Sequence, residues 1–497
     1  MIRILSVDNM RKSDAAAIAA GTSGRELMFR AGQRIFENVA WKPPVGILCG
    51  SGNNAGDGYV IAKLLRDAGI ACDLILLSEK FSEDGAYYYN LCREAGIPSL
   101  LWNPVIDLTK YKTIADCLFG TGFRGEVRSP AREAIEAVNK SGAYVVAVDI
   151  NSGLNGDSGM AELCVRSDLT VSVGDFQPGH FLNMAKDVMK EKINCDIGIE
   201  PVDRAYSLIE ASDLAELFRP RKNFSNKGTY GYTALIGGSK RYSGAIRLAG
   251  MANAAMRAGA GVVKLAVPDV LFPVIAPAVL ESTLFPLSDD GNEMAFSEKE
   301  FANLVSNVKT AAFGMGIGTG EGAGKALEYL LAHFTGRLIV DADGLTLLSR
   351  MDREKIRNAA CTLVLTPHVK EFSRLTGLSV SEIQNSPLPA AEAYAKENRV
   401  ILLLKGPATV ITDGETTYLT DTGCAGMATA GSGDVLSGIL AAILGFAPDP
   451  LFGTAAAAWI NGKAGELAQQ KYGSVSMVAG DTIASIAEAI RSVSATE

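Results

Sequence analysis

The sequence predicts an α/β protein of two domains, and three observations lead to that prediction. Short apolar, β-branched runs alternate with amphipathic segments of helical length over residues 45–173. The same alternation starts again at residue 232, after a charged connector. The chain has 497 residues, which is too long for a single hydrophobic core. Two α/β units in tandem account for all three.

The first half reads as helices followed by a parallel sheet. Apolar residues recur at helical spacing from Met10 to about Val39, which predicts helical structure there. Helix-length segments then separate the apolar runs, as parallel strands require. The expected strands are 45–49, 72–77, 113–119, 144–150 and 169–173, and the expected crossover helices include 59–68 and 130–140.

A charged connector separates the two halves. The run from Asp196 to Ile199 closes the first unit, and residues 214–223 hold Pro220 among several charged residues. Such a composition disfavours a core element. We therefore expect one domain over residues 1–212 and a second over residues 213–497.

The second half is again predicted to be α/β, with a helical last third. The expected strands are 232–237, 261–267, 310–313, 338–340, 363–365, 400–404, 408–412 and 417–420. The expected helices are 243–258, 434–444, 453–471 and 481–491.

Composition favours small-molecule chemistry in the cytoplasm. A net charge of -8 offers no basic field for nucleic acid or for an anionic membrane. The most apolar stretch, 435–447, is too short to span a bilayer, and Asp8 precedes any apolar region of signal length. The 8 cysteines form no close pairs, so we expect reduced thiols rather than zinc knuckles or a disulfide framework.

Polar groups follow several predicted strands of the first half. Gly50 to Gly58 and the run Gly120-Thr121-Gly122-Phe123-Arg124-Gly125 are glycine-rich loops that suit an anion, although the second alone is as well read as a turn. Loops after adjacent parallel strands converge on one crevice. Oxygen ligands there could hold a monovalent or divalent cation, whereas each residue singly is more often a turn former or N-cap. The polar residues in question are Asn53, Asn54, Asp57, Asp116, Asp149 and Ser152.

A second phosphate-cradling segment, Thr429 to Asp434, precedes a predicted helix. Its backbone amides can stabilise negative charge while Asp434 takes a proton from an attacking hydroxyl. An N-cap role would explain the acid but not the preceding Ala-Gly-Ser-Gly. Lys405 follows an apolar run and needs an anionic partner, unless it is a hairpin-turn lysine. His368, a lone histidine, is expected to make a contact only.

Together these motifs closely resemble the bifunctional NAD(P)H-hydrate repair enzymes over nearly the whole chain. The resemblance implies a Rossmann-like, three-layer epimerase domain over 1–212 and a ribokinase-like, nucleotide-dependent dehydratase domain over 213–497. It implies that Asp149 and Asp434 are catalytic, and that Asn54, Asp116 and Ser152 hold K⁺. The implied contacts to hydrated NADH or NADPH are Asn53, Asn54, Ala55, Gly56, Asp57, Gly120, Thr121, Gly122, Phe123, Arg124, Gly125, Glu126, Asp149, Ala245, Gly316, His368 and Asp434. The implied contacts to ADP or ATP are Lys405, Gly406, Pro407, Ala408, Thr409 and Gly433.

The resemblance further implies Mg²⁺ with the nucleotide and a homo-oligomer, while it leaves open ADP against ATP and NADHX against NADPHX. The chain departs from the family pattern at Ala55, Asn151 and Gln177, where Gly, Pro and Lys are usual, and at Phe29 and Val369-Lys370. Two alternatives remain: a ribokinase-like small-molecule kinase with a non-catalytic N-terminal binding domain, and a binding or scaffold protein.

Overall fold

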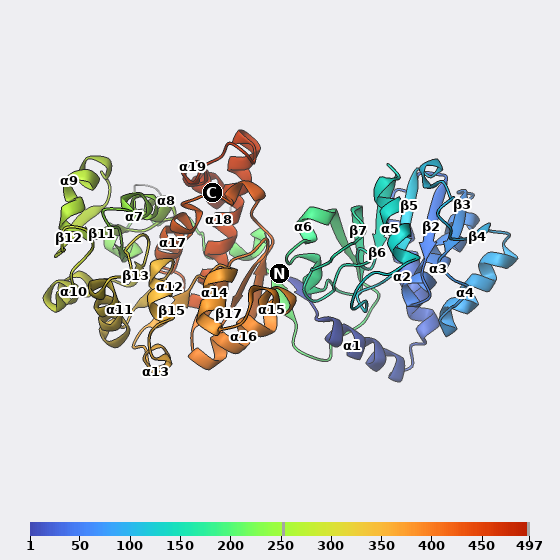
Figure 1. Cartoon of the computed structure of the whole chain (residues 1–497), viewed down its shortest axis with the longest axis horizontal. Helices are drawn as coiled ribbons and strands as arrows, with labels where there is room; N and C mark the ends of the chain where they lie inside the picture. The colour runs from blue at the N-terminus through green and yellow to red at the C-terminus, as the bar shows by residue number, and fades with distance from the viewer. Residues whose placement is uncertain (251–253, 495–497) are drawn as a thin grey trace. The chain divides into compact units, whose positions relative to one another are not determined.

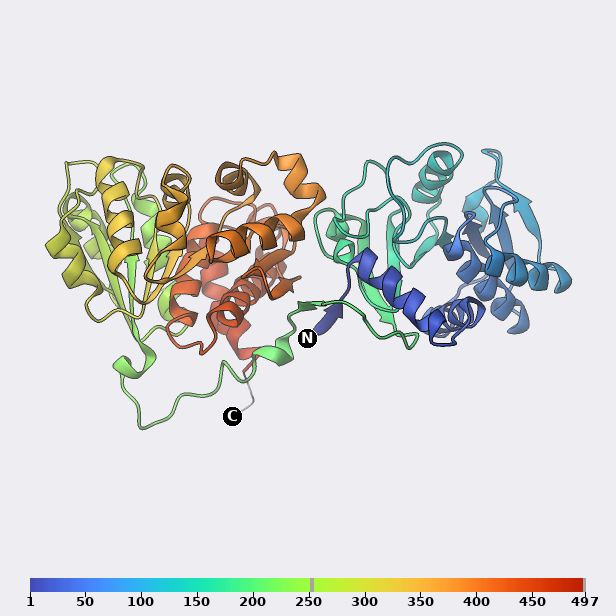
Figure 2. The same cartoon turned by 90° about the horizontal axis from the view of Figure 1, so that it is seen from below.

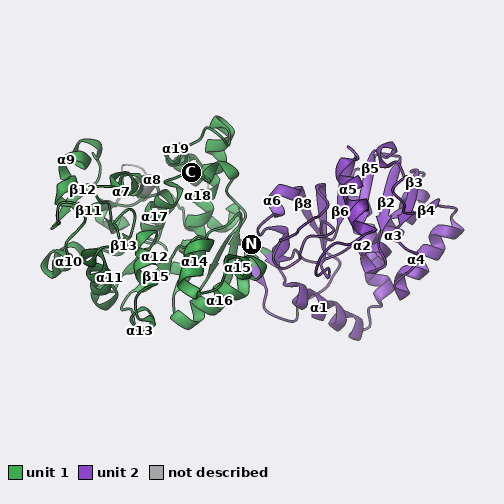
Figure 3. Ribbon diagram, in the orientation of Figure 1, with its two compact units in different colours: residues 1–2, 207–497 green, residues 3–206 purple. Residues whose placement is uncertain are grey.

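The computed structural model describes residues 1–250 and 254–494 of the chain. Contacts divide these residues into two compact units, one of residues 3–206 and one of residues 1–2 and 207–494 (Figure 3). The α/β class is confirmed in both. The boundary between catalytic domains at residues 212 and 213 stays a prediction, since contacts alone do not assign function.

The unit of residues 3–206 is a parallel sheet in the order β4-β3-β2-β5-β6-β7-β8 (Figure 1). Its strands are β2 (Val45–Cys49), β3 (Cys72–Leu76), β4 (Ser99–Leu101), β5 (Thr113–Cys117), β6 (Tyr144–Val148), β7 (Ser167–Val173) and β8 (Met189–Cys195). Its helices are α1 (Val7–Ala19), α2 (Gly24–Asn38), α3 (Asn53–Asp67), α4 (Glu83–Glu94), α5 (Ala131–Lys140) and α6 (Ala185–Val188).

Helices cover both faces of this sheet because neighbouring residues of a strand point to opposite sides. Ile47 of β2 packs with α2, α3 and α4, whereas the next residue, Leu48, packs with α5. Both sides are therefore apolar, which explains why the strands read as continuous hydrophobic runs. The expected three-layer arrangement is found.

The second unit is built on a larger mixed sheet with helices packed against it (Figure 2). Its strands stand in the order β9-β18-β17-β16-β15-β14-β13-β10-β11-β12. Its strands are β9 (Tyr206–Leu208), β10 (Tyr232–Ile236), β11 (Val262–Pro268), β12 (Thr283–Leu287), β13 (Thr310–Phe313), β14 (Arg337–Val340), β15 (Thr362–Leu365), β16 (Ile401–Leu404), β17 (Thr409–Thr412) and β18 (Thr417–Thr420). The pairs from β12 to β16 are parallel, while β16, β17 and β18 form antiparallel pairs.

One face of this sheet packs on α7 (Ser243–Gly250), α8 (Ala254–Arg257), α17 (Ser432–Ile443), α18 (Pro450–Tyr472) and α19 (Ala479–Arg491). The remaining helices are α9 (Phe272–Ile275), α10 (Glu298–Val305), α11 (Glu321–His333), α12 (Asp343–Leu348), α13 (Arg353–Arg357), α14 (Val369–Thr376), α15 (Val380–Asn385) and α16 (Pro387–Asn398). The predicted helix 243–258 corresponds to α7 and α8, and its residues 251–253 lie outside the described residues.

The connector differs in one respect from the expectation. Residues 219–224 are exposed, as their charges predict, but Leu214 and Phe218 are buried in the core of the second unit. Burial of these two apolar side chains is favourable even though the residues next to them in the sequence are charged. No helix among the described residues is long and apolar enough to cross a membrane.

Candidate active sites

A cavity of about 590 Å³ lies where β2, β5 and β6 end in the first unit. Asn53 and Asn54 follow β2, the loop from Leu118 to Phe123 follows β5, and Asp149 follows β6, and all of them line it. Because carboxyl ends of parallel strands share one edge, loops from distant parts of the sequence meet there. The crevice expected from the sequence is present, with these polar side chains in its wall.

Asp149 is held in an uncommon backbone conformation at this wall. Its φ is 67°, the left-handed region that only a few residue types other than glycine adopt. One carboxylate oxygen accepts the N–H of Thr121 at 2.7 Å. Burial raises the pKa of Asp149 to about 6, although the Thr121 hydrogen bond opposes the shift. A carboxyl that titrates near neutrality suits proton transfer.

His180 fixes the backbone of Asp149 from behind. The N–H of Gln177 donates to Nδ1 of His180 at 3.0 Å, so Nε2 carries the proton and donates to the carbonyl of Asp149 at 2.8 Å. Burial lowers the pKa of His180 to about 4, which keeps the ring neutral. No sequence pattern indicates this role, since the two residues lie on different loops.

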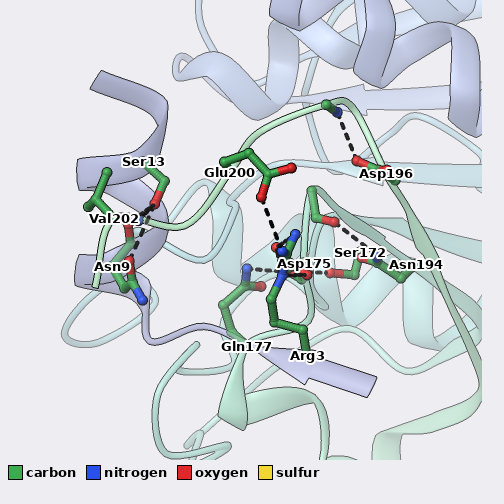
Figure 4. A network of polar contacts seen from close by, with 12 residues as sticks. Arg3, Asn9, Ser13, Ser172, Asp175, Gln177, Asn194, Asp196, Glu200 and Val202 are labelled. Carbon is green, nitrogen blue, oxygen red and sulfur yellow. Dashed lines mark hydrogen bonds and ion pairs between the residues drawn. The ribbon is translucent and has the colours of Figure 1, made fainter. Parts of the chain in front are cut away.

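Two departures from the family pattern have structural partners. Figure 4 shows the Gln177 amide directed at the carbonyl of Asp175, a bond of 2.6 Å, while Arg3 pairs with the Asp175 carboxylate. Asn151 is fully buried, and its amide donates to the carbonyls of Val165 and Val188. Both side chains therefore secure the loops around the cavity.

Two of the three predicted cation ligands, Asp116 and Ser152, are in direct contact. The hydroxyl of Ser152 donates to Asp116 at 2.6 Å, and both residues are fully buried. Burial raises the pKa of Asp116 to about 6 against the hydrogen bonds from Ser152. Asn54 is 8% exposed, and neither its carbonyl oxygen nor its amide nitrogen has a hydrogen-bond partner among the described residues. A buried carbonyl oxygen without a partner fits a weakly hydrated monovalent ion.

A divalent ion fits the predicted ligands of the first unit less well than a monovalent one. Among the described residues, no group of three or more His, Cys, Asp and Glu side chains is placed to hold a metal ion. A cation in this unit would therefore depend on neutral oxygens as well as carboxylates, as the sequence-based ligand set does.

Some of the other residues in the predicted loops line the cavity, and the rest lie away from it. Asp57, Gly120, Thr121, Gly122 and Phe123 line the cavity. Ala55 and Gly56 are buried within α3, and Arg124 pairs with Asp157 at 2.8 Å at the surface. Gly125 and Glu126 are exposed. Asp14 and Arg11 of α1 also line the cavity, and neither is among the residues predicted from the sequence.

The second site forms around Lys405 at the end of β16. Its ammonium lies 2.9 Å from one oxygen of Asp341, whose other oxygen accepts the hydroxyl of Ser437 at 2.9 Å. Glu371 lies 4.0 Å from the same ammonium. Burial lowers the pKa of Lys405, but the charges of Asp341 and Glu371 outweigh that effect and the pKa is raised. Lys405 therefore has the anionic partner that its apolar surroundings require.

Asp434 lies in the first turn of α17, next to this charged group. Gly431 precedes the helix with a φ of 93°, and a side chain there would collide with Leu248. A side chain added at Gly433 would lie 3.4 Å from Asp341 and 3.6 Å from Lys405, so the start of α17 faces them closely. Burial and the charge of Asp341 raise the pKa of Asp434 to about 7, and Lys405 opposes the shift.

The remaining predicted residues lie around this group. Gly406, Pro407 and Ala408 form the turn between β16 and β17, and Thr409 begins β17. The backbone of His368 bridges to that of Lys405, and its ring caps α14 by accepting the N–H groups of Lys370 and Glu371. The ring therefore has a structural role, and its contact with substrate stays a prediction.

Gly316 and Ala245 lie beside each other. A side chain at Gly316, whose φ is 64°, would stand 3.1 Å from the Ala245 methyl group and 2.7 Å from the carbonyl of Tyr242. Tyr242 lines a hollow of about 500 Å³ together with Lys240, Arg241 and Asp343. Asp341 is not among the site residues predicted from the sequence, and only its contact with Lys405 reveals its place in the site.

Comparisons with known proteins match both units. Residues 24–179 match the family model described as YjeF-related protein N-terminus, and residues 233–488 match the one described as NAD(P)H-hydrate dehydratase. The chain is 34% identical over 492 residues to the bifunctional NAD(P)H-hydrate repair enzyme Nnr of Archaeoglobus fulgidus, covering 98% of this chain and 99% of that one. It is 31% identical to the enzyme of the same name from Escherichia coli, covering 96% and 92%.

A solved structure also resembles the second half. The ADP/ATP-dependent NAD(P)H-hydrate dehydratase from Bacillus subtilis, co-crystallised with ATP/Mg²⁺, is 27% identical with a TM-score of 0.51, and the match covers 58% of this chain and 99% of that one.

Proposed function

Because the chain belongs to the family of bifunctional NAD(P)H-hydrate repair enzymes, we propose that it repairs hydrated NADH and NADPH at two sites. The domain of residues 1–212 interconverts the R and S epimers. The domain of residues 213–497 dehydrates the S epimer, with ADP or ATP as the phosphoryl donor. Division of labour between two sites explains why two α/β units share one chain.

The observation that carries the dehydratase assignment is the convergence of Asp434, Lys405 and the start of α17. Asp434, with a pKa of about 7, takes the proton of the substrate hydroxyl as that oxygen attacks the terminal phosphate. Lys405 and the amides at the start of α17 stabilise the charge on the transferred group. The phosphorylated hydroxyl is then a good leaving group, and its elimination restores the conjugated ring.

A magnesium ion bound together with the nucleotide would be held at this site. Asp341 and Glu371 supply carboxylate oxygens beside Lys405, a donor set that suits an ion which keeps several waters and is held mainly by phosphates. The ion would neutralise phosphate charge during transfer. The turn of Lys405 to Thr409, with Gly433, is the proposed nucleotide contact, and Ala245, Gly316 and His368 are the proposed substrate contacts.

The epimerase assignment rests on the cavity beside Asp149. The proposed substrate contacts are residues 53–57 and 120–126, and Asp149 is the proposed catalytic residue. Potassium, held by Asn54, Asp116 and Ser152, would place a positive charge beside the bound dinucleotide. A homo-oligomer, a cytoplasmic location and the absence of nucleic-acid partners also stay predictions.

One experiment tests the proposed function. Mixed epimers of hydrated NADH are added to the full chain with excess ADP or ATP, and the reduced-nicotinamide absorbance is followed. We expect complete recovery, faster than spontaneous epimerisation allows. Recovery that stalls at the S fraction would remove the epimerase assignment, and no recovery with either nucleotide would contradict the dehydratase.

A further inference from the structure

One face of helix α1 forms part of the wall of the first cavity. Val7, Met10, Arg11, Asp14 and Ile18 line it, at the three- and four-residue spacing of a single helical face. Two of these residues are charged and three are apolar. Asp14 is the carboxylate of that face, and it reaches the cavity from an element that lies far from the strand-end loops in the sequence.

Asp14 shares the cavity with Asp149. Burial raises the pKa of Asp14 to about 6, and the negative charge of Asp149 adds to the rise. Asp57, on α3, also has its pKa raised by burial and by both of these carboxylates. Neighbouring negative charges disfavour the full ionisation of such a group. The carboxyls of this one cavity can therefore supply both an acid and a base.

The space between these carboxyls is built for a polar ligand. Asn54 is 8% exposed, lines the same cavity, and has both polar side-chain atoms without a protein partner. Burying an amide in this way is costly unless a ligand completes its hydrogen bonds. Asp14 and Asp149 therefore line a ligand-binding site and are not simply part of a solvated acidic surface.

Epimerisation of the hydrated ring needs an acid and a base. The hydroxyl is on the ring carbon bonded to nitrogen, so the C–O bond can break as the nitrogen lone pair forms a C=N bond. The departing oxygen takes a proton from the acid and leaves as water. A water molecule then adds to the other face of the cationic ring and gives a proton to the base, which leaves the number of protons unchanged.

We propose that Asp14 is a second catalytic residue of the epimerase, acting with Asp149 as the acid and base of this water exchange. The two carboxyls reach the cavity from different elements, α1 and the end of β6, as transfer at two faces of a ring requires. Asp149 is fixed by Thr121 and His180, whereas the Asp14 carboxylate accepts no hydrogen bond from the part of the chain that the structure describes. The proposal rests on the proposed epimerase function of residues 1–212.

The test uses Asp14→Asn in the full chain, because the dehydratase in the same molecule reports correct folding and concentration. On mixed epimers with excess nucleotide, we expect the epimerase kcat to fall by roughly 10²- to 10⁴-fold with KM changed less than about threefold, the range for losing an acid–base group. The dehydratase rate on pure S epimer stays at the wild-type value. Asp8→Asn is the matched control, since Asp8 is exposed on the same helix and pairs with Lys12.

A labelled-water measurement separates catalysis from a structural role. In H₂¹⁸O, each wild-type epimerisation inserts one solvent oxygen, and Asp14→Asn should slow label uptake as much as inversion. Asp14→Glu, which keeps the carboxyl, should recover part of both rates. Inversion without label uptake in the wild type, a near-normal kcat in Asp14→Asn, or a change in KM alone would each overturn the proposal.

Two further outcomes keep the proposals distinguishable. A wild-type chain that dehydrates S epimer but never accelerates inversion would remove the epimerase function and this role together. If Asp14→Asn lost both activities, the fate of Asp14→Glu would decide: dehydration restored without inversion contradicts the proposal, and restoration of both supports it.

Discussion

Nε2 of His180 lies 2.8 Å from the backbone carbonyl oxygen of Asp149, and this bond holds the proposed catalytic carboxylate from outside the cavity. The ring is fully buried and neutral, with its other nitrogen occupied by Gln177. The segment of residues 177–180 is thereby tied to the loop that holds Asp149.

Replacing His180 with Leu should destabilise the first unit. The carbonyl of Asp149 and the N–H of Gln177 would both lose their partner, at a cost of about 2 to 4 kcal/mol. Urea unfolding followed in the full chain should show its first transition shifted to lower denaturant. Epimerase turnover should fall while dehydration of pure S epimer stays unchanged. His333→Leu, at an exposed position of the second unit, is the control, and equal losses in both variants would contradict the role of His180.

The cost of His180→Leu should also depend on pH. The pKa of His180 is about 4 in the folded chain, against an ordinary value near 6.5. As the pH falls, His180 therefore takes up a proton in the unfolded chain before it does so in the folded chain. The stability that the neutral ring contributes is present above pH 6.5 and is lost as the pH falls toward 4. The free-energy difference between wild type and variant should shrink by up to roughly 3 kcal/mol over that window. A difference that is constant from pH 7 to pH 4.5 would show that the ring is not neutral.

Asp434→Asn should abolish most dehydration while nucleotide binding persists. Losing a general base lowers turnover by roughly two to four orders of magnitude. Binding is checked by the rise in unfolding temperature with ATP, which follows RT ln(1 + [L]/Kd). Asp269→Asn, at an exposed residue, serves as the matched control. Near-normal turnover in Asp434→Asn would exclude it as the base.

The dehydration rate should rise with pH through the titration of Asp434. A general base works only when it has lost its proton, and the pKa of Asp434 is raised to about 7 by burial and by Asp341. We therefore expect kcat/KM on S epimer to rise about tenfold per unit below pH 7 and to level off above it. Asp341→Asn removes one source of the shift and should move the midpoint to lower pH. A midpoint near 4 in the wild type would contradict the assignment.

Exchanging potassium for sodium should slow only the epimerase. The carbonyl oxygen of Asn54 suits a large, weakly hydrated ion, and the smaller sodium ion would fit it poorly. Inversion of the R epimer should fall in sodium buffer and fall further in Asp116→Asn, while dehydration of S epimer serves as the internal reference. Equal rates in both salts would leave Asn54, Asp116 and Ser152 without a role in ion binding.

Much of the fold could be predicted from sequence because central parallel strands are apolar on both faces. Runs 45–49 and 310–313 are predicted at the bounds of β2 and β13. Edge strands are harder to predict in this way: β8 holds three consecutive charged residues, Lys190 to Lys192, and is buried only at its two ends, and β4 is only three residues long. Neither presents a continuous apolar run, so the periodicity that identifies the centre of the sheet is missing at its edges.

A candidate site could be predicted from the sequence where all the residues of its motif are contiguous. Gly431 to Asp434 is contiguous, and its glycine requirement is visible in the backbone as a positive φ. Asp14 and Asp341 were not predictable, because each gains its meaning from a partner far away in the chain: Asp149 for one and Lys405 for the other. Spatial pairing of this kind leaves no local pattern.

The left-handed backbone of Asp149 has a consequence for how this position can vary. Most side chains clash with their own backbone at a φ of 67°, and Asn, Asp and Gly are the residues that adopt it most readily. If every amino acid were placed at position 149, most of them would lower the stability of the first unit by about 1 to 2 kcal/mol. Asn and Gly would cost the least, and they would keep the shape of the site without its carboxylate. Substitutions at position 149 would thus abolish the reaction more readily than they would disrupt the fold.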